Sequence, residues 1–322
     1  MNVTLSSLKT LPDREDLPAD ERAEQALWQE RYAHEVRDIV VHNLIPSPKL
    51  TIIVVTYRPK EYLIECLQHL RGQTARGAVS YEIMIADSGG CEFLRDRTPA
   101  LCDIDLRLRD GISLNAARNA AMAFARGEYV AIVDDDGLVD PTFVEVINEM
   151  FKDPTVAAFR GRIVPKHHPY FNTLASHYDR GDEIVDDELT TEGHMAIRRR
   201  IYLLTGGFPD QLSGHEGIYL VYRLKSMFPG MRSLYVPALI MRHDYYDGVQ
   251  KLIRKARKYN AIEGQVMAVE NSEEFARYFK SATTGKKPTR PLTPELQVAR
   301  ALLDITRFVV RHAPEWAFPK KK

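Results

Sequence analysis

Along residues 49–160, short apolar runs rich in β-branched residues alternate with segments whose apolar positions recur at helical spacing. The apolar runs predict strands, and the segments between them predict helices. Strands that alternate with helices are typical of an α/β protein with a Rossmann-like, doubly wound and mainly parallel sheet. The predicted strands are Leu50–Thr56, Tyr81–Ala86, Asp103–Leu108 and Tyr129–Val133. The predicted helices are Glu61–Arg71, Ser113–Arg126 and a third from Asp140 to about Phe151.

The segment before this region predicts one helix from Pro18 to Val41 that packs on the main domain. Four large apolar residues recur at helical spacing within residues 18–41. They are Trp28, Tyr32, Val36 and Ile39. The pattern after residue 160 is more irregular, with further strands expected near Ala157–Ile163 and Ser233–Met241.

We therefore expect three parts in the chain. They are a helical N-terminal extension over residues 1–47, a main domain over 48–250 and a helical C-terminal region over 251–322. The C-terminal region has a polar break around residues 283–290 and ends in an apolar helical stripe. The stripe packs on the core or joins two copies into a homodimer, and it consists of Leu296, Leu302, Leu303, Ile305 and Val309.

The composition limits the class of protein and the cellular compartment in which it is expected. The 322 residues are 44% hydrophobic and 27% charged with zero formal net charge, which is a globular profile rather than that of a nucleic-acid binder. The three cysteines are few and odd in number, which favours a reducing, cytoplasmic environment. Residues 1–9 lack the apolar core of a signal peptide, and no run approaches the ~20 apolar residues of a membrane span. Peripheral contact with the inner face of a membrane stays open.

Three consecutive aspartates, Asp134, Asp135 and Asp136, follow the apolar run Tyr129–Val133. Carboxylates at the edge of a buried strand repel one another and are hard to desolvate, and a bound cation is the simplest compensation. In an extended chain Asp134 and Asp136 point the same way, roughly 6.5 Å apart at Cα. One can then contact a ligand while the other holds a divalent ion. The alternative is a solvated turn whose aspartates only cap the next helix.

Polar residues also follow the first two predicted strands. The first strand ends at Thr56, Tyr57 and Arg58, and the second ends at Asp87 before Ser-Gly-Gly. Ligands bind beyond the carboxyl ends of strands in an open parallel sheet, so we expect these residues to line one site with the aspartates. Asp87 suits the NH or OH groups of a base or ribose, although it could simply form a turn. No Gly-x-Gly-x-x-Gly or Walker loop follows the first strand, which argues against a dehydrogenase or P-loop enzyme.

Taken in order, these pieces resemble the inverting glycosyltransferases of family 2, which have the GT-A fold. The likeness covers residues 50–145 closely and becomes patchier beyond 160. The matching segments are Thr51–Tyr57, Cys66–Gln73, Glu82–Gly89, Asn115–Asn119, Gly127–Asp136, Gly206–Phe208, Gly214–Gly217 and a late histidine, His243.

The resemblance implies a nucleotide-sugar donor site in residues 48–145 and an acceptor half in residues 146–250. Asp136 would ligate Mn²⁺ or Mg²⁺ on the diphosphate, and His243 would complete the metal site unless it is only structural. Asp135 is expected to be the most replaceable aspartate, and Arg118 could equally form a plain ion pair with the aspartates. The residues implied to hold the donor are Thr56, Tyr57, Arg58, Asp87, Arg118, Asp134 and Asp135.

The acceptor side departs from the family pattern. Many members carry a Glu-Asp pair after the Gly-Gly-Phe segment, whereas this chain has Glu216-Gly217. Inversion needs a base that deprotonates the acceptor hydroxyl. Glu216 is the first candidate and His215 the second, and Glu216 could instead only orient the acceptor. A basic segment around Arg254 and Arg257 could approach phosphates or form a solvated face.

The sequence thus predicts a metal-dependent inverting glycosyltransferase that uses a nucleoside diphosphate sugar, with UDP the expected nucleotide. The expected acceptor is a hydroxyl of a glycan, a lipid-linked sugar or a small molecule, and no nucleic acid is involved. The altered Gly217 position keeps open a non-catalytic nucleotide-sugar-binding or assembly module. A sugar-phosphate nucleotidyltransferase fits less well because it needs a glycine-rich loop after the first strand, where Thr56-Tyr57-Arg58 stands.

Overall fold

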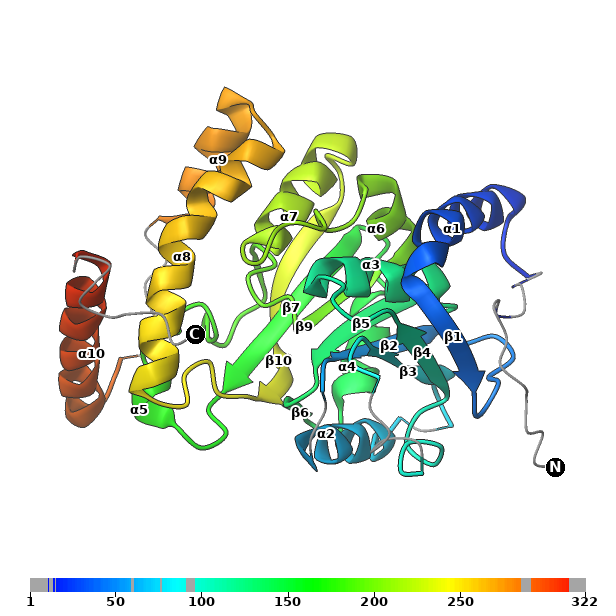
Figure 1. Cartoon of the computed structure of the whole chain (residues 1–322), viewed down its shortest axis with the longest axis horizontal. Helices are drawn as coiled ribbons and strands as arrows, with labels where there is room; N and C mark the ends of the chain where they lie inside the picture. The colour runs from blue at the N-terminus through cyan, green and yellow to red at the C-terminus, as the bar shows by residue number, and fades with distance from the viewer. Residues whose placement is uncertain are drawn as a thin grey trace.

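The structure is a computed structural model, and it describes residues 11, 14, 16–58, 61–75, 77–90, 96–284 and 291–312. Its centre is one ten-stranded sheet with helices on both faces (Figure 1). The strand order is β1-β4-β3-β2-β5-β9-β7-β10-β6, and β8 pairs with β10. Two apolar clusters lie on opposite sides of the sheet, which confirms the doubly wound α/β arrangement.

The first half of the sheet is parallel. It consists of β2 (Leu50–Thr56), β3 (Tyr81–Asp87), β4 (Ile104–Leu108) and β5 (Tyr129–Asp134). Ile52 and Val54 join the apolar cluster on one face and Ile53 joins the other, as expected for a strand buried on both sides. The connecting helices are α2 (Glu61–Arg71) and α3 (Leu114–Phe124). Ser113 caps α3 as predicted, because its hydroxyl accepts from the Ala116 N–H at 3.1 Å.

The second half of the sheet is mixed. β9 (His194–Arg198) runs antiparallel between β5 and β7 (Val156–Val164), and β10 (Arg232–Arg242) is parallel to β7. The short strands β6 (Leu138–Val139) and β8 (Val185–Asp186) pair antiparallel with β10. The two strands predicted here are confirmed and extend slightly further.

The helices of this half are short except for α7. They are α4 (Phe143–Met150), α5 (Pro169–Asn172), α6 (Arg199–Thr205) and α7 (Glu216–Met227). α4 begins after Thr142 rather than at Asp140, and the Thr142 side chain forms no capping hydrogen bond. Gly206 ends α6 in the left-handed conformation, φ 88°, which glycine adopts without strain.

The N-terminal segment contains a strand that the sequence did not predict. α1 (Ala19–Tyr32) is followed by a single 3₁₀ turn, η1 (Ala33–Glu35), and then by β1 (Val36–Val41). The prediction of one helix through Val41 is therefore wrong. Four of the six β1 residues are β-branched, and β1 pairs antiparallel with the otherwise open side of β4. The predicted packing of the helix holds for Trp28 and Tyr32, which are buried against Tyr202 and the α3 side of the sheet.

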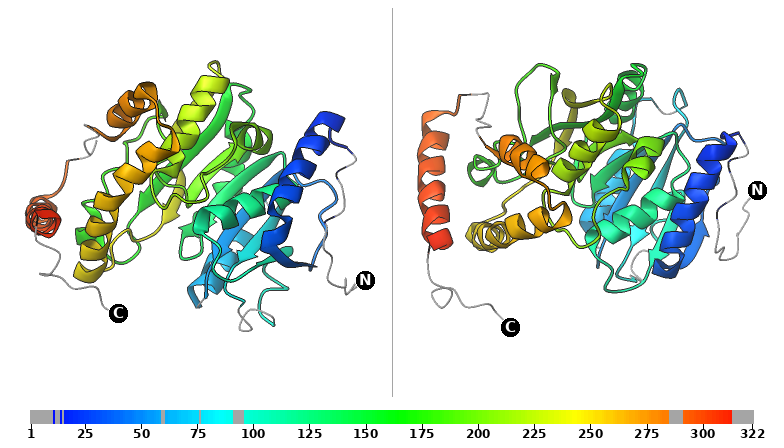
Figure 2. Two further views of the ribbon diagram at one scale, coloured as in Figure 1. Left: turned by 45° about the horizontal axis from the view of Figure 1, so that its top comes forward. Right: turned by 90° about the horizontal axis from the view of Figure 1, so that it is seen from above.

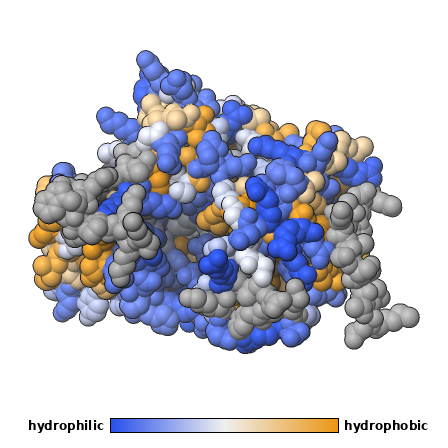
Figure 3. Space-filling model, viewed as in Figure 1, coloured by the Kyte–Doolittle hydropathy of each residue, from blue (hydrophilic) through white to orange (hydrophobic). Residues whose placement is uncertain are grey.

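The C-terminal region is helical, as predicted. It contains α8 (Val249–Val269), α9 (Glu273–Thr283) and α10 (Pro294–His312), which Figure 2 shows beyond the β10 end of the sheet. α9 packs on α7 through Phe275 and Phe279. On α10, Leu302 and Ile305 are each 61% exposed, and apolar side chains are visible at this edge of the molecule in Figure 3. Among the described helices, none combines the length and hydrophobicity that a bilayer span requires.

Candidate functional site

The aspartate triplet lies at the carboxyl edge of the sheet. β5 ends at Asp134, and a tight turn follows in which the Gly137 N–H donates to the Asp134 carbonyl at 3.0 Å. A Cβ placed on Gly137 would lie 2.4 Å from the Met241 sulfur, so this turn packs closely against β10. This contact brings the turn next to His243, which directly follows β10.

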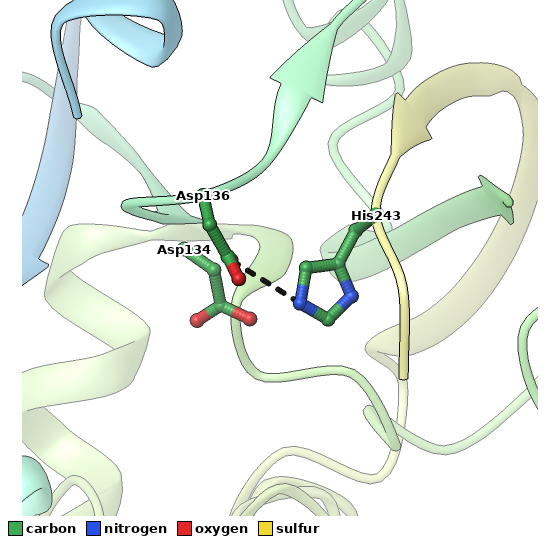
Figure 4. Close-up of side chains that lie close together, drawn as sticks. All are labelled: Asp134, Asp136 and His243. Atoms are coloured by element: carbon green, nitrogen blue, oxygen red, sulfur yellow. Dashed lines mark ion pairs between the residues drawn. The ribbon is translucent and has the colours of Figure 1, made fainter. Parts of the chain in front are cut away.

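Asp134, Asp136 and His243 converge on one point. One oxygen of each carboxylate and one ring nitrogen of the histidine lie within 4.8 Å of one another (Figure 4). His243 Nε2 is 3.2 Å from Asp136 Oδ1, and His243 Nδ1 is 2.9 Å from the Tyr178 hydroxyl, which orients the ring. Two carboxylates and an imidazole are ligands that Mn²⁺ accepts well, and Mg²⁺ can use the carboxylates. The residues present therefore fit a divalent metal site.

The pKa values of Asp135 and Asp136 are shifted in opposite directions. Burial tends to raise the pKa of Asp136, but the hydrogen bond and charge of His243 outweigh it and hold that pKa below its usual value. Burial and the charges of its two neighbours raise the pKa of Asp135 to about 7, against the opposing hydrogen bond from Thr56. Asp135 lies outside the Asp-Asp-His cluster, since its Oδ2 instead accepts from the Thr56 hydroxyl at 2.6 Å.

The predicted donor residues lie at adjoining strand ends. Thr56 and Asp87 are paired in register at the ends of β2 and β3. Asp87 is buried and its Oδ1 accepts from the Gly89 N–H at 2.9 Å, which is the turn-forming role that the sequence left open. Arg58 adopts a left-handed φ of 50°, and its guanidinium lies 5.1 Å from the ring of the half-exposed Tyr57. All four residues thus border the same edge of the sheet.

Arg118 connects the aspartates to the beginning of α7. It extends from α3, is 4% exposed, and its Nη1 donates to Glu216 Oε1 at 3.0 Å. Its Nη2 lies 3.6 Å from Asp134 Oδ1. The ion pair that the sequence offered as an alternative role for Arg118 is therefore present, and it has two carboxylate partners.

The two predicted base candidates differ in their surroundings. Glu216 is buried, and its second oxygen, Oε2, has no hydrogen-bond partner among the residues that the structure describes. His215 precedes α7 in a left-handed conformation, φ 63°, and its ring meets the Phe279 ring edge-on at 5.2 Å. Both residues lie where α7 begins, and Glu216 contacts Arg118.

Glu192 is a site residue that the sequence reasoning missed. Its Oε1 accepts from the Gly217 N–H at 3.0 Å, and the side chain is half-buried. Burial and the nearby Glu216 raise the pKa of Glu192 to about 8, although Arg118 opposes the shift. In the sequence, the neighbouring Gly193 is the one sign that this segment lies close to other backbone or side chains. A Cβ on Gly193 would lie 1.9 Å from the Asp134 carboxyl, so this segment has to follow the aspartate closely.

Lys255 is a second residue that the sequence reasoning did not single out. Its ammonium lies 3.3 Å from the Tyr245 ring centre, and burial together with Lys251 lowers its pKa to about 7. Asp134 and Asp136 act in the opposite direction on this pKa, which places Lys255 within the field of the acidic cluster. Arg254, which the sequence offered for phosphate contact, is exposed.

Sequence comparison identifies the family. The family model for glycosyl transferase family 2 matches residues 51–210, a span that holds the strands from β3 to β9, all of β2 except Leu50, and the aspartate triplet. The chain belongs to this family. The resemblance read from the strand ends is thereby confirmed.

Two curated relatives of this family member illustrate the match. The chain is 28% identical over 113 residues to the putative glycosyltransferase EpsH of Bacillus subtilis, which covers 34% of this chain and 32% of that protein. It is 26% identical over 191 residues to the glucosyl-dolichyl phosphate glucuronosyltransferase of Haloferax volcanii, which covers 52% and 58%. The matched part thus spans less than two thirds of either relative.

A solved structure of low identity has the same fold. The mannosyltransferase PcManGT from Pyrobaculum calidifontis, solved in complex with GDP-Man and Mn²⁺, superposes with a TM-score of 0.53 at 20% identity. The superposition covers 91% of this chain and 81% of that one. It confirms the predicted GT-A type of α/β fold.

Proposed function

We propose that this family 2 member transfers a sugar from a nucleoside diphosphate to an acceptor hydroxyl with inversion at the anomeric carbon. The observation that carries the proposal is the convergence of Asp134, Asp136 and His243 at the sheet edge where ligands of open α/β sheets bind. The solved mannosyltransferase of the same fold was obtained with a nucleotide sugar and Mn²⁺, which supports this reading.

In this proposal Asp134, Asp136 and His243 hold Mn²⁺ or Mg²⁺. When bound, the ion would neutralise charge that develops on the departing diphosphate. Lys255 lies within the field of the cluster, where its ammonium form can contact the same phosphates. Arg118 balances the charge of Asp134 and fixes Glu216, so that the donor and acceptor sides keep a set spacing.

Thr56, Tyr57, Arg58 and Asp87 form the proposed nucleotide end of the donor site. Thr56 lies at the end of β2, one strand away from Asp134, and Asp87 lies at the end of β3, one strand further, which suits a base and ribose whose diphosphate reaches the metal. Asp135 is proposed to support this end through its hydrogen bond with Thr56. UDP is the proposed nucleotide, and GDP is included in the test because of the structural neighbour.

We propose that residues 48–145 form the donor half, residues 146–250 the acceptor half, and residues 1–47 and 251–322 the two extensions. The acceptor is proposed to be a glycan, a lipid-linked sugar or a small molecule. The name of the archaeal relative, a glucosyl-dolichyl phosphate glucuronosyltransferase, favours the lipid-linked sugar among these. A cytoplasmic location with contact at the inner membrane face would suit such an acceptor.

The test is release of nucleoside diphosphate from UDP-glucose, UDP-GlcNAc, UDP-glucuronate and GDP-mannose. Each donor is incubated with Mn²⁺, with Mg²⁺ and with EDTA. A transferase should release diphosphate slowly to water from at least one donor, and only with metal. A non-catalytic binding module, which the altered Gly217 position favours as the second candidate, should show metal-dependent thermal stabilisation by a donor without any release.

A further inference from the structure

We propose that Glu192 is the general base that deprotonates the acceptor, in place of the aspartate that the family resemblance puts at position 217. The proposal rests on the transferase function proposed above. It assigns to Glu216 the task of positioning Arg118 and Asp134.

The backbone leaves no room for a side chain at position 217. A Cβ on Gly217 would lie 1.8 Å from the Leu189 carbonyl oxygen and 3.0 Å from Glu192 Oε1. The carboxylate of Glu192 therefore lies beside the place where the usual aspartate would start. The Gly217 N–H, in the first turn of α7, donates to Glu192 at 3.0 Å and holds this carboxylate in position.

Glu192 is also better placed than Glu216 to receive a proton. Glu216 is 4% exposed, and its Oε1 already accepts a hydrogen bond from the Arg118 guanidinium at 3.0 Å, so that oxygen is engaged within the protein. Glu192 is partly exposed, whereas Glu216 is buried. Its raised pKa of about 8 matches what a base needs near neutral pH.

The chain links Glu192 directly to the metal site. The adjacent Gly193 accepts the Asp134 N–H through its carbonyl at 2.8 Å, and its Cα packs on the Asp134 carboxyl. The base and the proposed metal ligand are thus held by consecutive backbone contacts.

Transfer of the sugar to the acceptor needs no reactant other than the donor, the acceptor and the Glu192 carboxylate. The acceptor O–H proton moves to the Glu192 carboxylate while the oxygen forms a bond to the anomeric carbon. The bond from that carbon to the diphosphate oxygen breaks, and its electron pair leaves with the nucleoside diphosphate. Approach from the face opposite the leaving group inverts the anomeric centre.

The experiment uses azide, an anion that attacks carbon without needing a base. Nucleoside diphosphate release to water is measured for the full chain with Mn²⁺ and the donors named above, with and without sodium azide. Glu192→Ala and Glu192→Gln should lose roughly 10²- to 10⁴-fold in release to water. Azide should restore release and yield a glycosyl azide of inverted configuration. The glutamine variant keeps an oxygen acceptor for the Gly217 N–H, which guards against a folding defect.

Two matched variants separate a base from a structural role. Glu183→Ala, an exposed glutamate earlier in the same segment, should behave as wild type. Glu216→Gln should lose activity that azide does not restore. If both Glu192 variants keep wild-type release, or bind donor normally but are not rescued by azide, the assignment is overturned. Absence of release by the wild-type chain from any donor would overturn the proposed function itself.

Discussion

Arg118 and Glu216 form a buried ion pair, with 3.0 Å between Nη1 and Oε1 and both side chains about 5% exposed. Breaking a buried pair from one side leaves an uncompensated charge, which is more damaging than removing both partners. The pair joins α3 to α7 and therefore the donor half to the acceptor half of the proposed site.

We expect Arg118→Met to lower the free energy of unfolding by about 3–5 kcal/mol, because Glu216 is left buried and unpaired. The double variant Arg118→Met with Glu216→Leu should lose markedly less. Urea unfolding at pH 7 measures both. The control is Arg232→Met in the exposed pair with Asp186, which should change stability by less than about 1 kcal/mol. A double variant as unstable as the single one would contradict the prediction.

Restoring the family's usual aspartate should harm this protein. Gly217→Asp and Gly217→Ala both place a Cβ 1.8 Å from the Leu189 carbonyl, and backbone has to move to relieve it. We expect a loss of about 1–3 kcal/mol or more in unfolding free energy. Gly230→Ala is the matched control, since a Cβ there meets no atom within 4 Å. If the Gly217→Ala and Gly230→Ala proteins are equally stable, the close approach of the Leu189 carbonyl does not exclude a side chain at position 217.

Metal binding should depend on Asp136 and His243. Manganese at about 100 times its dissociation constant should stabilise the wild-type protein by about 2.7 kcal/mol. Asp136→Asn and His243→Gln should remove most of this gain, which thermal unfolding with and without Mn²⁺ will reveal. Asp186→Asn, an exposed carboxylate on β8, should respond like wild type. A full manganese shift in the Asp136 and His243 variants would place the ion elsewhere.

Asp135 should make the metal-free protein less stable as the pH rises. Its folded-state pKa of about 7 lies above the ordinary value of 3.8, so the folded protein binds more protons than the unfolded chain between these values. The contribution of Asp135 to the free energy of unfolding is therefore fully present below about pH 4 and is lost as the pH rises towards 7. Asp135→Asn, which stays neutral, should flatten the change between pH 5 and pH 7 in urea unfolding. An unchanged pH slope would contradict the raised pKa.

Lys255 should contribute to nucleotide affinity. Loss of one charge-assisted hydrogen bond is worth about 1.5–3 kcal/mol, so Lys255→Gln should weaken UDP or GDP binding in the presence of Mn²⁺ by roughly tenfold or more. Isothermal titration calorimetry measures this directly. Lys258→Gln, an exposed position on the same helix, is the control. Equal weakening by both changes would indicate a general charge effect of α8 rather than a contact by Lys255.

The parallel half of the fold was predictable because its signals are local. Runs such as Leu50–Thr56 are buried on both faces, and the residue types alone indicate this. The aspartates and Asp87 were predictable as one site because the carboxyl ends of parallel strands meet at one edge. β1 was missed because Val36 and Ile39 fit helical spacing as well as a strand, and only pairing with β4 decides between them.

Glu192 and Lys255 could not be assigned from the sequence for a different reason. Their roles depend on which distant segment folds against them. β9 enters the sheet antiparallel beside β5, and this placement brings Glu192 to the first turn of α7. Lys255 differs from the exposed Arg254 only by the rotation of α8, which the packing of Leu252 and Tyr246 sets. The spacing of residues along the sequence does not indicate contacts between such distant segments.

The pairing of β1 with β4 bears on how the protein behaves at high concentration. Without β1, the outer side of β4 would offer a row of free N–H and C=O groups, a template on which other chains can add strands and aggregate. β1 covers that side and presents the exposed, charged Arg37 on the strand that now forms the rim. The N-terminal segment thus moves the open edge of the sheet from β4 to β1, and a chain shortened to residues 48–322 would expose the edge of β4.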